Sequence, residues 1–169
     1  QIEKQVMEVN FWAAVALTKA VLPHMLSRNT GQIWTVSSIL GFFGSPKLAA
    51  YAASKFAVIG YFESLQYELQ NSGVHAGILS PGFINTSVTV KSLGPNGVPI
   101  GVNSNAQEKG MLPEVLARKL LKKTARHKLP KLIVIGGYER FSIPFKRFFP
   151  NLFSLVYSKL TNVTRKKNA

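Results

Sequence analysis

The chain has 169 residues, a formal net charge of +14 and a sequence pI of about 10.3. Hydrophobic residues make up 46% of it, which is too large a share for a disordered basic tail, and this length suits one domain or part of one. All seven acidic residues are Glu and there is no Cys, so the composition excludes an Asp-dependent catalytic triad, a disulfide framework, a thiolate metal site and a cysteine nucleophile.

The predicted elements alternate between helix and strand. Apolar residues recur at helical spacing over residues 2–27, and residues 32–37 have the β-branched and aromatic content of a short buried strand. A second helical pattern covers residues 48–70, and an apolar strand over residues 74–80 follows it. These four elements already indicate a repeated strand and helix arrangement.

The rest of the chain continues this alternation. Residues 83–110 are rich in Gly and poor in bulky side chains, so we expect a long loop that covers a site. Pro113 suits the first turn of a third helix that ends near His127, and residues 131–135 form a third apolar strand. Strands separated by helices of this length imply parallel crossovers and a sheet covered on both faces. The sequence therefore predicts an α/β fold, the later portion of a doubly wound parallel sheet of Rossmann type, over residues 1–137.

The last part of the chain differs in composition. Residues 1–110 hold seven Lys or Arg and five Glu, whereas residues 111–169 hold fourteen Lys or Arg and two Glu. Within residues 138–169, bulky apolar residues are interleaved with Lys and Arg, which is typical of an interfacial helix that binds anionic lipid headgroups. A dimer contact or a helix that caps the substrate site fits the same pattern. We expect an amphipathic, basic tail over residues 138–169 that associates with membranes.

Tyr51 and Lys55 form the sharpest local pattern. Residues four apart lie one turn apart on the same helix face, so the ammonium of Lys55 is expected to lower the pKa of Tyr51 from its ordinary value of about 10. A tyrosine with a lowered pKa can donate a proton to a carbonyl or remove one from an alcohol. The alternative is a surface Tyr-Lys pair on an amphipathic helix.

Two further polar residues accompany this pair. Ser38 ends a strand thirteen residues before Tyr51, at the carboxyl end where ligands bind in doubly wound folds, and its hydroxyl could bond the same substrate oxygen. An ordinary strand-end cap would use the same residue type. Asn10 lies in an apolar run of the first helix, where a buried amide needs partners, as a core Asn also would.

Together, these four residues resemble the catalytic residues of the short-chain dehydrogenase/reductase family, and the resemblance covers roughly residues 6–90. It implies that Tyr51 is the general acid or base, and that Lys55 holds the cofactor ribose and stabilises the phenolate of Tyr51. It further implies that Ser38 orients the substrate oxygen and that Asn10 fixes a water between Lys55 and solvent. The implied activity is that of an NAD(P)-dependent oxidoreductase, with hydride transfer between nicotinamide and a carbonyl or secondary alcohol.

A second segment of the sequence resembles the cofactor site of this family. Residues 81–86 match its Pro-Gly-x-x-x-Thr pattern, which implies that Pro81, Gly82 and Thr86 bind the nicotinamide. The family's Gly-rich pyrophosphate turn and its ribose-reading residue precede the part seen here, so NAD and NADP both stay open, with NADP favoured. We expect the chain to be the C-terminal part of a longer enzyme and to be inactive alone. A shortened variant that has lost activity is the alternative.

The same reasoning gives expectations about partners. The aromatic residues near the site favour a hydrophobic substrate, and the two long helices match those through which family members often form homodimers. The tail resembles that of the microsomal dehydrogenase/reductase member 7 branch of the family, which implies association with the endoplasmic reticulum membrane. The competing class is a basic module that binds membranes or nucleic acid. No recognition motif accompanies the charge, so we expect no nucleic-acid partner, and the three separated His residues indicate no metal site.

Overall fold

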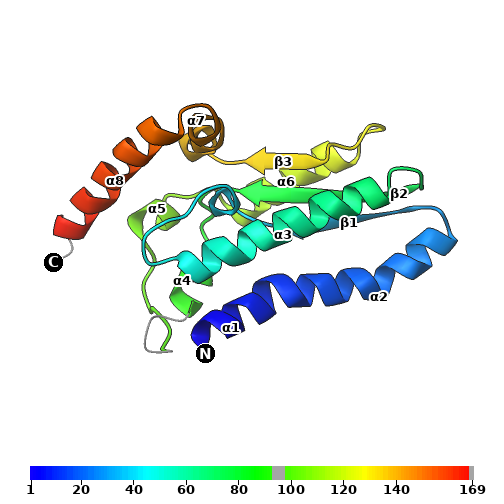
Figure 1. Ribbon diagram of the computed structural model, residues 1–169, viewed down its shortest axis with the longest axis horizontal. Helices are drawn as coiled ribbons and strands as arrows, with labels where there is room; N and C mark the ends of the chain where they lie inside the picture. Colours follow the sequence, from blue (N-terminus) through cyan, green and yellow to red (C-terminus); the bar gives the residue numbers. More distant parts are fainter. Residues whose placement is uncertain (93–97, 168–169) are drawn as a thin grey trace.

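A three-stranded parallel sheet forms the centre of the fold (Figure 1). The computed structural model describes residues 1–92 and 98–167, with side chains in the second range up to residue 161. The strands are β1 (Gly31–Val36), β2 (Val74–Pro81) and β3 (Leu132–Ile135). They are hydrogen-bonded in the order β1-β2-β3, and both pairings are parallel, as the alternation of helix and strand predicted.

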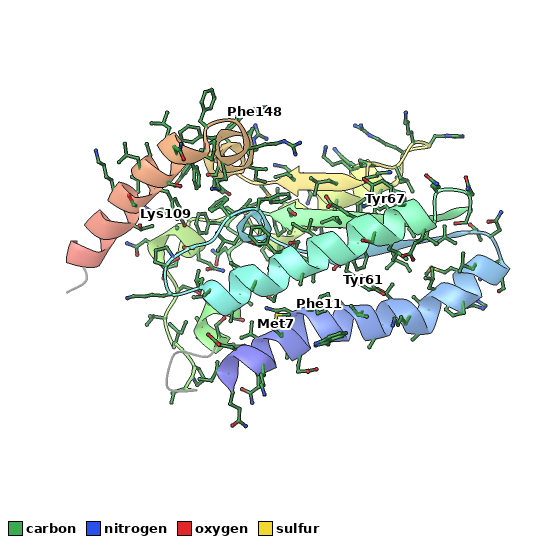
Figure 2. All side chains as sticks on the ribbon, in the orientation of Figure 1. Met7, Phe11, Tyr61, Tyr67, Lys109 and Phe148 are labelled. Carbon is green, nitrogen blue, oxygen red and sulfur yellow. The ribbon has the colours of Figure 1, made fainter. Side chains whose placement is uncertain are left out.

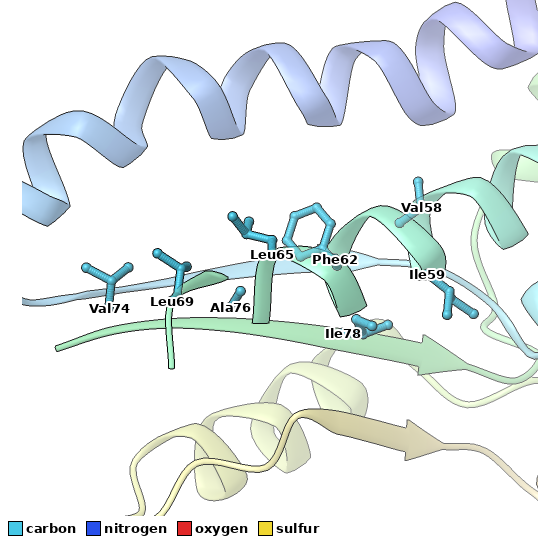
Figure 3. Packing of buried hydrophobic residues seen from close by; sticks show 8 residues of the cluster. All are labelled: Val58, Ile59, Phe62, Leu65, Leu69, Val74, Ala76 and Ile78. Atoms are coloured by element: carbon cyan, nitrogen blue, oxygen red, sulfur yellow. The ribbon is translucent and has the colours of Figure 1, made fainter. Parts of the chain in front are cut away.

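Helices cover both faces of this sheet. Successive side chains of a strand point to opposite faces, so neighbouring residues of β2 pack against different helices. Ile78 of β2 packs with α3 (Ala49–Glu68) in one buried cluster, in which Figure 3 shows Ile59 on the side of β2 and Val58 on the side of the first helix. The next residue, Leu79, packs instead with Leu120 of α6 (Pro113–Thr124). The predicted α/β fold, a parallel sheet with helices on both faces, is thereby confirmed.

The first helix runs along α3 and contacts it. It consists of α1 (Ile2–Met7), a π-helical turn (Glu8–Trp12) and α2 (Ala13–Ser27), without a break between them. Phe11 meets Tyr61 of α3 edge to face, with ring centroids 6.1 Å apart (Figure 2). By length and composition alone this helix is long and apolar enough to cross a membrane, a property that a core helix of a soluble protein can share. Its packing against α3 makes it part of the domain described here.

The segment between β2 and α6 is more ordered than the predicted long loop. It contains two short helices, α4 (Val88–Lys91) and α5 (Asn105–Glu108), and the hydroxyl of Thr89 donates a hydrogen bond to the side chain of Gln107. Part of the predicted loop lies outside the described residues. The described part folds back on itself beside the carboxyl ends of the strands (Figure 1).

The tail begins after β3 with a tight turn over Tyr138–Phe141 and continues as α7 (Ser142–Phe148) and α8 (Pro150–Lys167). In Figure 1 the arrowheads of β2 and β3 point toward the end of the molecule where this tail lies. The tail is therefore near the carboxyl ends of the strands, where the sequence predicts the site.

One side of the tail packs against the chain that follows Ser38. The ring of Phe153 lies 5.0 Å from that of Phe43 and stacks on Tyr157 at 5.3 Å, measured between centroids. The Tyr157 hydroxyl donates a hydrogen bond to Ser45 Oγ at 2.9 Å. One side of the tail is therefore packed against the domain. This agrees with the alternative interpretation of the tail as a helix that packs on the domain.

Candidate active site

Ser38 and Tyr51 meet where β1 ends and α3 begins. Ser38 Oγ accepts a hydrogen bond from Leu40 N at 3.2 Å, which caps the short helical turn Ile39–Gly41. Tyr51 lies in the first turn of α3, and a hydrogen-bonding interaction with the Ser38 side chain acts to lower the pKa of its phenol. Ser38 therefore caps the end of the strand, which is the alternative weighed from the sequence, and it also interacts with Tyr51. Its hydrogen bond to a substrate oxygen stays a prediction.

Lys55 lies one helical turn after Tyr51, as the spacing predicted. Its Nζ is 5.6 Å from the centre of the Tyr51 ring. The same ammonium donates a hydrogen bond to the carbonyl oxygen of Val36, the last residue of β1, at 3.0 Å. Lys55 thus links the start of α3 to the carboxyl end of β1.

Burial controls the ionisation of both groups. It raises the pKa of Tyr51 above its ordinary value, more strongly than the Ser38 interaction lowers it, and it lowers the pKa of Lys55. The expectation that Lys55 lowers the pKa of Tyr51 is wrong for this structure. The reason is that removal from water disfavours the phenolate, while the lysine ammonium is hydrogen-bonded to a backbone carbonyl.

Asn10 lies in the π-helical turn of the first helix and reaches across to α3. Its Nδ2 donates a hydrogen bond to Ser54 Oγ at 3.1 Å, and that hydroxyl donates in turn to the carbonyl oxygen of Tyr51 at 2.7 Å. Asn10 also lines, together with Lys55, a hollow of about 370 Å³ beside β1. Turns of π-helix are frequent at functional sites, but apolar spacing in a sequence does not reveal them.

Three supporting residues were not found from the sequence: Ser37, Gly41 and Ser54. Ser37 Oγ donates a hydrogen bond to the carbonyl oxygen of Lys55 at 3.0 Å. A Cβ on Gly41 would lie 2.6 Å from Ser37 Oγ and 3.0 Å from that carbonyl, so only glycine allows this close approach. Ser37 and Ser54 had a weak local signal, because Ser37 precedes Ser38 and Ser54 lies within the Tyr-x-x-x-Lys pattern. The contacts from Ser37 to Lys55 and from Asn10 to Ser54, however, join residues that are far apart in sequence.

The predicted cofactor segment begins at the same edge of the sheet. Val36 of β1 is level with Leu79 of β2, so the residues after both strands leave the sheet side by side. Pro81 ends β2, and Gly82 N donates to the carbonyl oxygen of Ile135 at 2.9 Å. Thr86 follows just before α4, where its Oγ1 accepts a long hydrogen bond from Val88 N at 3.5 Å.

Parallel strands with helices on both faces and polar residues at their carboxyl ends are typical of doubly wound α/β folds, which bind ligands at that edge of the sheet. A family model described as short chain dehydrogenase matches residues 1–95. The chain belongs to the short-chain dehydrogenase family.

Among curated relatives, the chain is 35% identical over 158 residues to a Dehydrogenase/reductase SDR family protein 7-like of Drosophila melanogaster, covering 94% of this chain and 48% of the relative. It is 35% identical over 136 residues to the SDR family member 7B of Danio rerio, covering 80% of this chain and 43% of the relative. These matches confirm the expected branch of the family. The chain spans about half the length of the curated relatives it matches.

Solved structures agree with this fold. A short-chain dehydrogenase from Streptomyces avermitilis is 21% identical with a TM-score of 0.72, covering 96% of this chain and 63% of that one. One from Burkholderia cenocepacia in complex with NADP is 21% identical with a TM-score of 0.69, covering 92% and 58%. A 4-hydroxyisoleucine dehydrogenase complexed with NADH is 26% identical with a TM-score of 0.59, covering 80% and 59%.

The interaction between Ser38 and Tyr51 makes a prediction about ionisation. Because this interaction lowers the pKa of Tyr51 against the effect of burial, Ser38→Ala should raise that pKa further. Tyrosinate absorbance measured against pH, with Tyr51→Phe in both backgrounds to isolate this phenol, reports the shift. Ser64→Ala on the exposed side of α3 is the matched control. An unchanged or lowered pKa in Ser38→Ala would show that the two hydroxyls do not interact.

Proposed function

We propose that the chain carries the catalytic half of an NAD(P)-dependent oxidoreductase that transfers a hydride between nicotinamide and a carbonyl or secondary alcohol. The observation that carries this proposal is the convergence of Ser38, Tyr51 and Lys55 at the carboxyl end of β1. Membership of the short-chain dehydrogenase family supports it.

Tyr51 is the proton donor and acceptor in this proposal. Burial raises the pKa of its phenol, so the group is protonated near neutral pH and can donate to the substrate oxygen when a carbonyl is reduced. When bound, nicotinamide supplies the hydride in this direction and accepts it in the reverse. In alcohol oxidation the phenolate form of Tyr51 would take the proton of the alcohol.

The other three residues orient the reacting groups. Ser38 would hydrogen-bond the substrate oxygen and stabilise the negative charge that develops on it. An ammonium has three donors, so Lys55 can keep its bond to Val36 and still hold the hydroxyls of the cofactor ribose. Asn10, fixed by Ser54, would hold a water that connects Lys55 to solvent.

The residues present fit the nicotinamide end of the cofactor. Pro81, Gly82 and Thr86 follow β2 at the edge of the sheet where Ser38 follows β1, and backbone and hydroxyl groups of this kind suit a carboxamide. The sequence contains no Gly-x-Gly-x-x-Gly turn for the pyrophosphate, so we propose that the chain is inactive by itself. NADP is favoured over NAD, in line with two similar structures whose names carry NADP and one whose name carries NADH. A shortened, inactive variant is the alternative.

The substrate in this proposal is hydrophobic. Phe43 packs with the tail and belongs to the core, so it does not support this choice. Support comes instead from apolar side chains that are exposed around the site, on Phe83 after β2 and on Val88, Ile100 and Val102 of the following segment. These residues offer exposed apolar surface on the segment that follows β2.

We further propose that the outer side of the tail binds a membrane, with the endoplasmic reticulum as its location. Phe148, Leu152 and Leu155 are exposed on the tail, and Figure 2 shows Phe148 on the outer side of α7. Arg147 accompanies them and is exposed, which suits anionic headgroups. The basic residues Arg165, Lys166 and Lys167, which add to this charge in the sequence, have side chains outside the described residues.

Two other parts of the proposal concern partners. A homodimer through the long helices is consistent with the exposed apolar residues Trp12 and Phe56. The competing class, a basic module that binds nucleic acid, draws on the same net charge but has no stacking platform or recognition motif in the sequence.

Loss of the proton donor tests the proposed chemistry. In the longer protein that carries this chain together with its Gly-rich turn, Tyr51→Phe should lower kcat by about 10²-fold to 10⁴-fold and leave the Kd for NADPH within about threefold of wild type. Steady-state kinetics and cofactor fluorescence titration measure the two quantities. Tyr67→Phe, on an exposed position of the same helix, is the control. Hydride transfer at wild-type rates in Tyr51→Phe would refute the proposed role.

The tail is tested with vesicles of phosphatidylcholine and phosphatidylserine. The triple variant Phe148→Ser, Leu152→Ser, Leu155→Ser should sediment with them at least about tenfold less than wild type, because each substitution removes apolar area available for burial in lipid. Leu17→Ser, an exposed leucine of α2, is the matched control.

The salt dependence of binding distinguishes a membrane partner from a nucleic-acid partner. Attachment through Phe and Leu should largely survive high salt, whereas binding to an oligonucleotide should weaken steeply. Unchanged sedimentation of the triple variant, or a preference for the oligonucleotide, would contradict the membrane proposal.

A further inference from the structure

We propose that Glu139 is a positioning residue that fixes the Pro81–Phe83 turn for nicotinamide binding, an inference that rests on the proposed function. Glu139 lies in the turn after β3, and its side chain is only 8% exposed. A carboxylate is rarely buried to this extent unless it is paired or hydrogen-bonded. The groups that hydrogen-bond to the Glu139 carboxylate therefore indicate its structural role.

The carboxylate joins the ends of two neighbouring strands. Glu139 Oε1 accepts a hydrogen bond from Phe83 N at 3.1 Å and a second from Gly137 N at 2.9 Å. Phe83 leaves β2 directly after Pro81 and Gly82, and Gly137 leaves β3. A single oxygen atom thus bridges the backbone of the cofactor segment to the backbone that follows the edge strand.

Three glycines make room for this carboxylate. A Cβ on Gly82 would lie 1.9 Å from Glu139 Oε1, and a Cβ on Gly136 would lie 2.8 Å from the same atom. A Cβ on Gly137 would lie 2.8 Å from Oε2. A larger residue at Gly82 would displace the Glu139 carboxylate from the position in which it accepts its two hydrogen bonds.

Hydrogen bonds from backbone N–H groups to a carboxylate are about twice as strong as those between neutral groups. Loss of the side chain leaves the N–H groups of Phe83 and Gly137 without this acceptor and opens a space beside Gly82. The turn is then free to move, and a misplacement of about 1 Å in a site that positions a reacting group can cost about 10²-fold in rate. Glu139 would act through the position of the turn, without touching the substrate.

The test is made in the longer protein and compares the length of the side chain at position 139 with its charge. Glu139→Gln keeps an acceptor oxygen at the same reach, whereas Glu139→Asp keeps the charge but is one methylene shorter, and Glu139→Ala removes both. We expect the Kd for NADPH to rise about tenfold or more in the Ala and Asp variants and to stay within about threefold of wild type in Gln. The KM for the carbonyl substrate should change less than the Kd for cofactor. Glu114→Ala, an exposed acid of α6, is the control.

A second readout does not depend on the cofactor. Hydrogen exchange of the Phe83 and Gly137 amides in the cofactor-free protein should be at least about tenfold faster in Ala and Asp than in wild type, and close to wild type in Gln. If Ala does not fold, the comparison of Asp with Gln decides.

Three outcomes would overturn the inference: wild-type Kd for NADPH in both Ala and Asp, equal damage in Gln and Asp, or a uniform loss of active protein with unchanged Kd. A wild-type protein that binds neither NADPH nor NADH would overturn the proposed function instead, and the exchange rates alone would then decide whether Glu139 holds the turn.

Discussion

The parallel pairing of β1 with β2 is the constraint on which the site depends. Val36 is level with Leu79 in this pairing, so Ser38 and Pro81 both follow strand ends at one edge of the sheet. α3 then begins beside the end of β1, where Lys55 is tied to Val36 by a hydrogen bond. A slip in strand register would separate Ser38 and Tyr51 from the segment that we propose for the nicotinamide.

Burial gives this edge its chemical character. It raises the pKa of Tyr51 and lowers that of Lys55, so both groups are driven toward their neutral forms. The Ser38 side chain counters this effect for Tyr51, and the Lys55 ammonium donates a hydrogen bond to the Val36 carbonyl oxygen. At the segment that we propose for the nicotinamide, the buried Glu139 carboxylate likewise has close polar partners, because it accepts hydrogen bonds from the backbone N–H groups of Phe83 and Gly137.

Short sequence patterns predicted the features that depend on residues close together in the sequence. Apolar spacing located the long helices and the strands, and the four-residue separation of Tyr51 and Lys55 placed both on one helix face. The direction of the Tyr51 pKa shift was wrong because spacing does not report depth of burial. The contact of the tail with the chain after Ser38 joins Phe153 to Phe43, and the bridge from Glu139 to Phe83 also joins residues that are far apart in sequence. Contacts of this kind follow from the topology of the sheet, which no short motif encodes.

The most direct test of the central claim, that these residues form one nicotinamide site, is a crystal structure of the longer protein with NADPH bound. The account predicts the ribose within hydrogen-bond distance of Lys55 and the nicotinamide against Pro81 and Gly82, with its reactive carbon facing the hydroxyls of Ser38 and Tyr51. A nicotinamide bound elsewhere, or a ribose out of reach of Lys55, would contradict it.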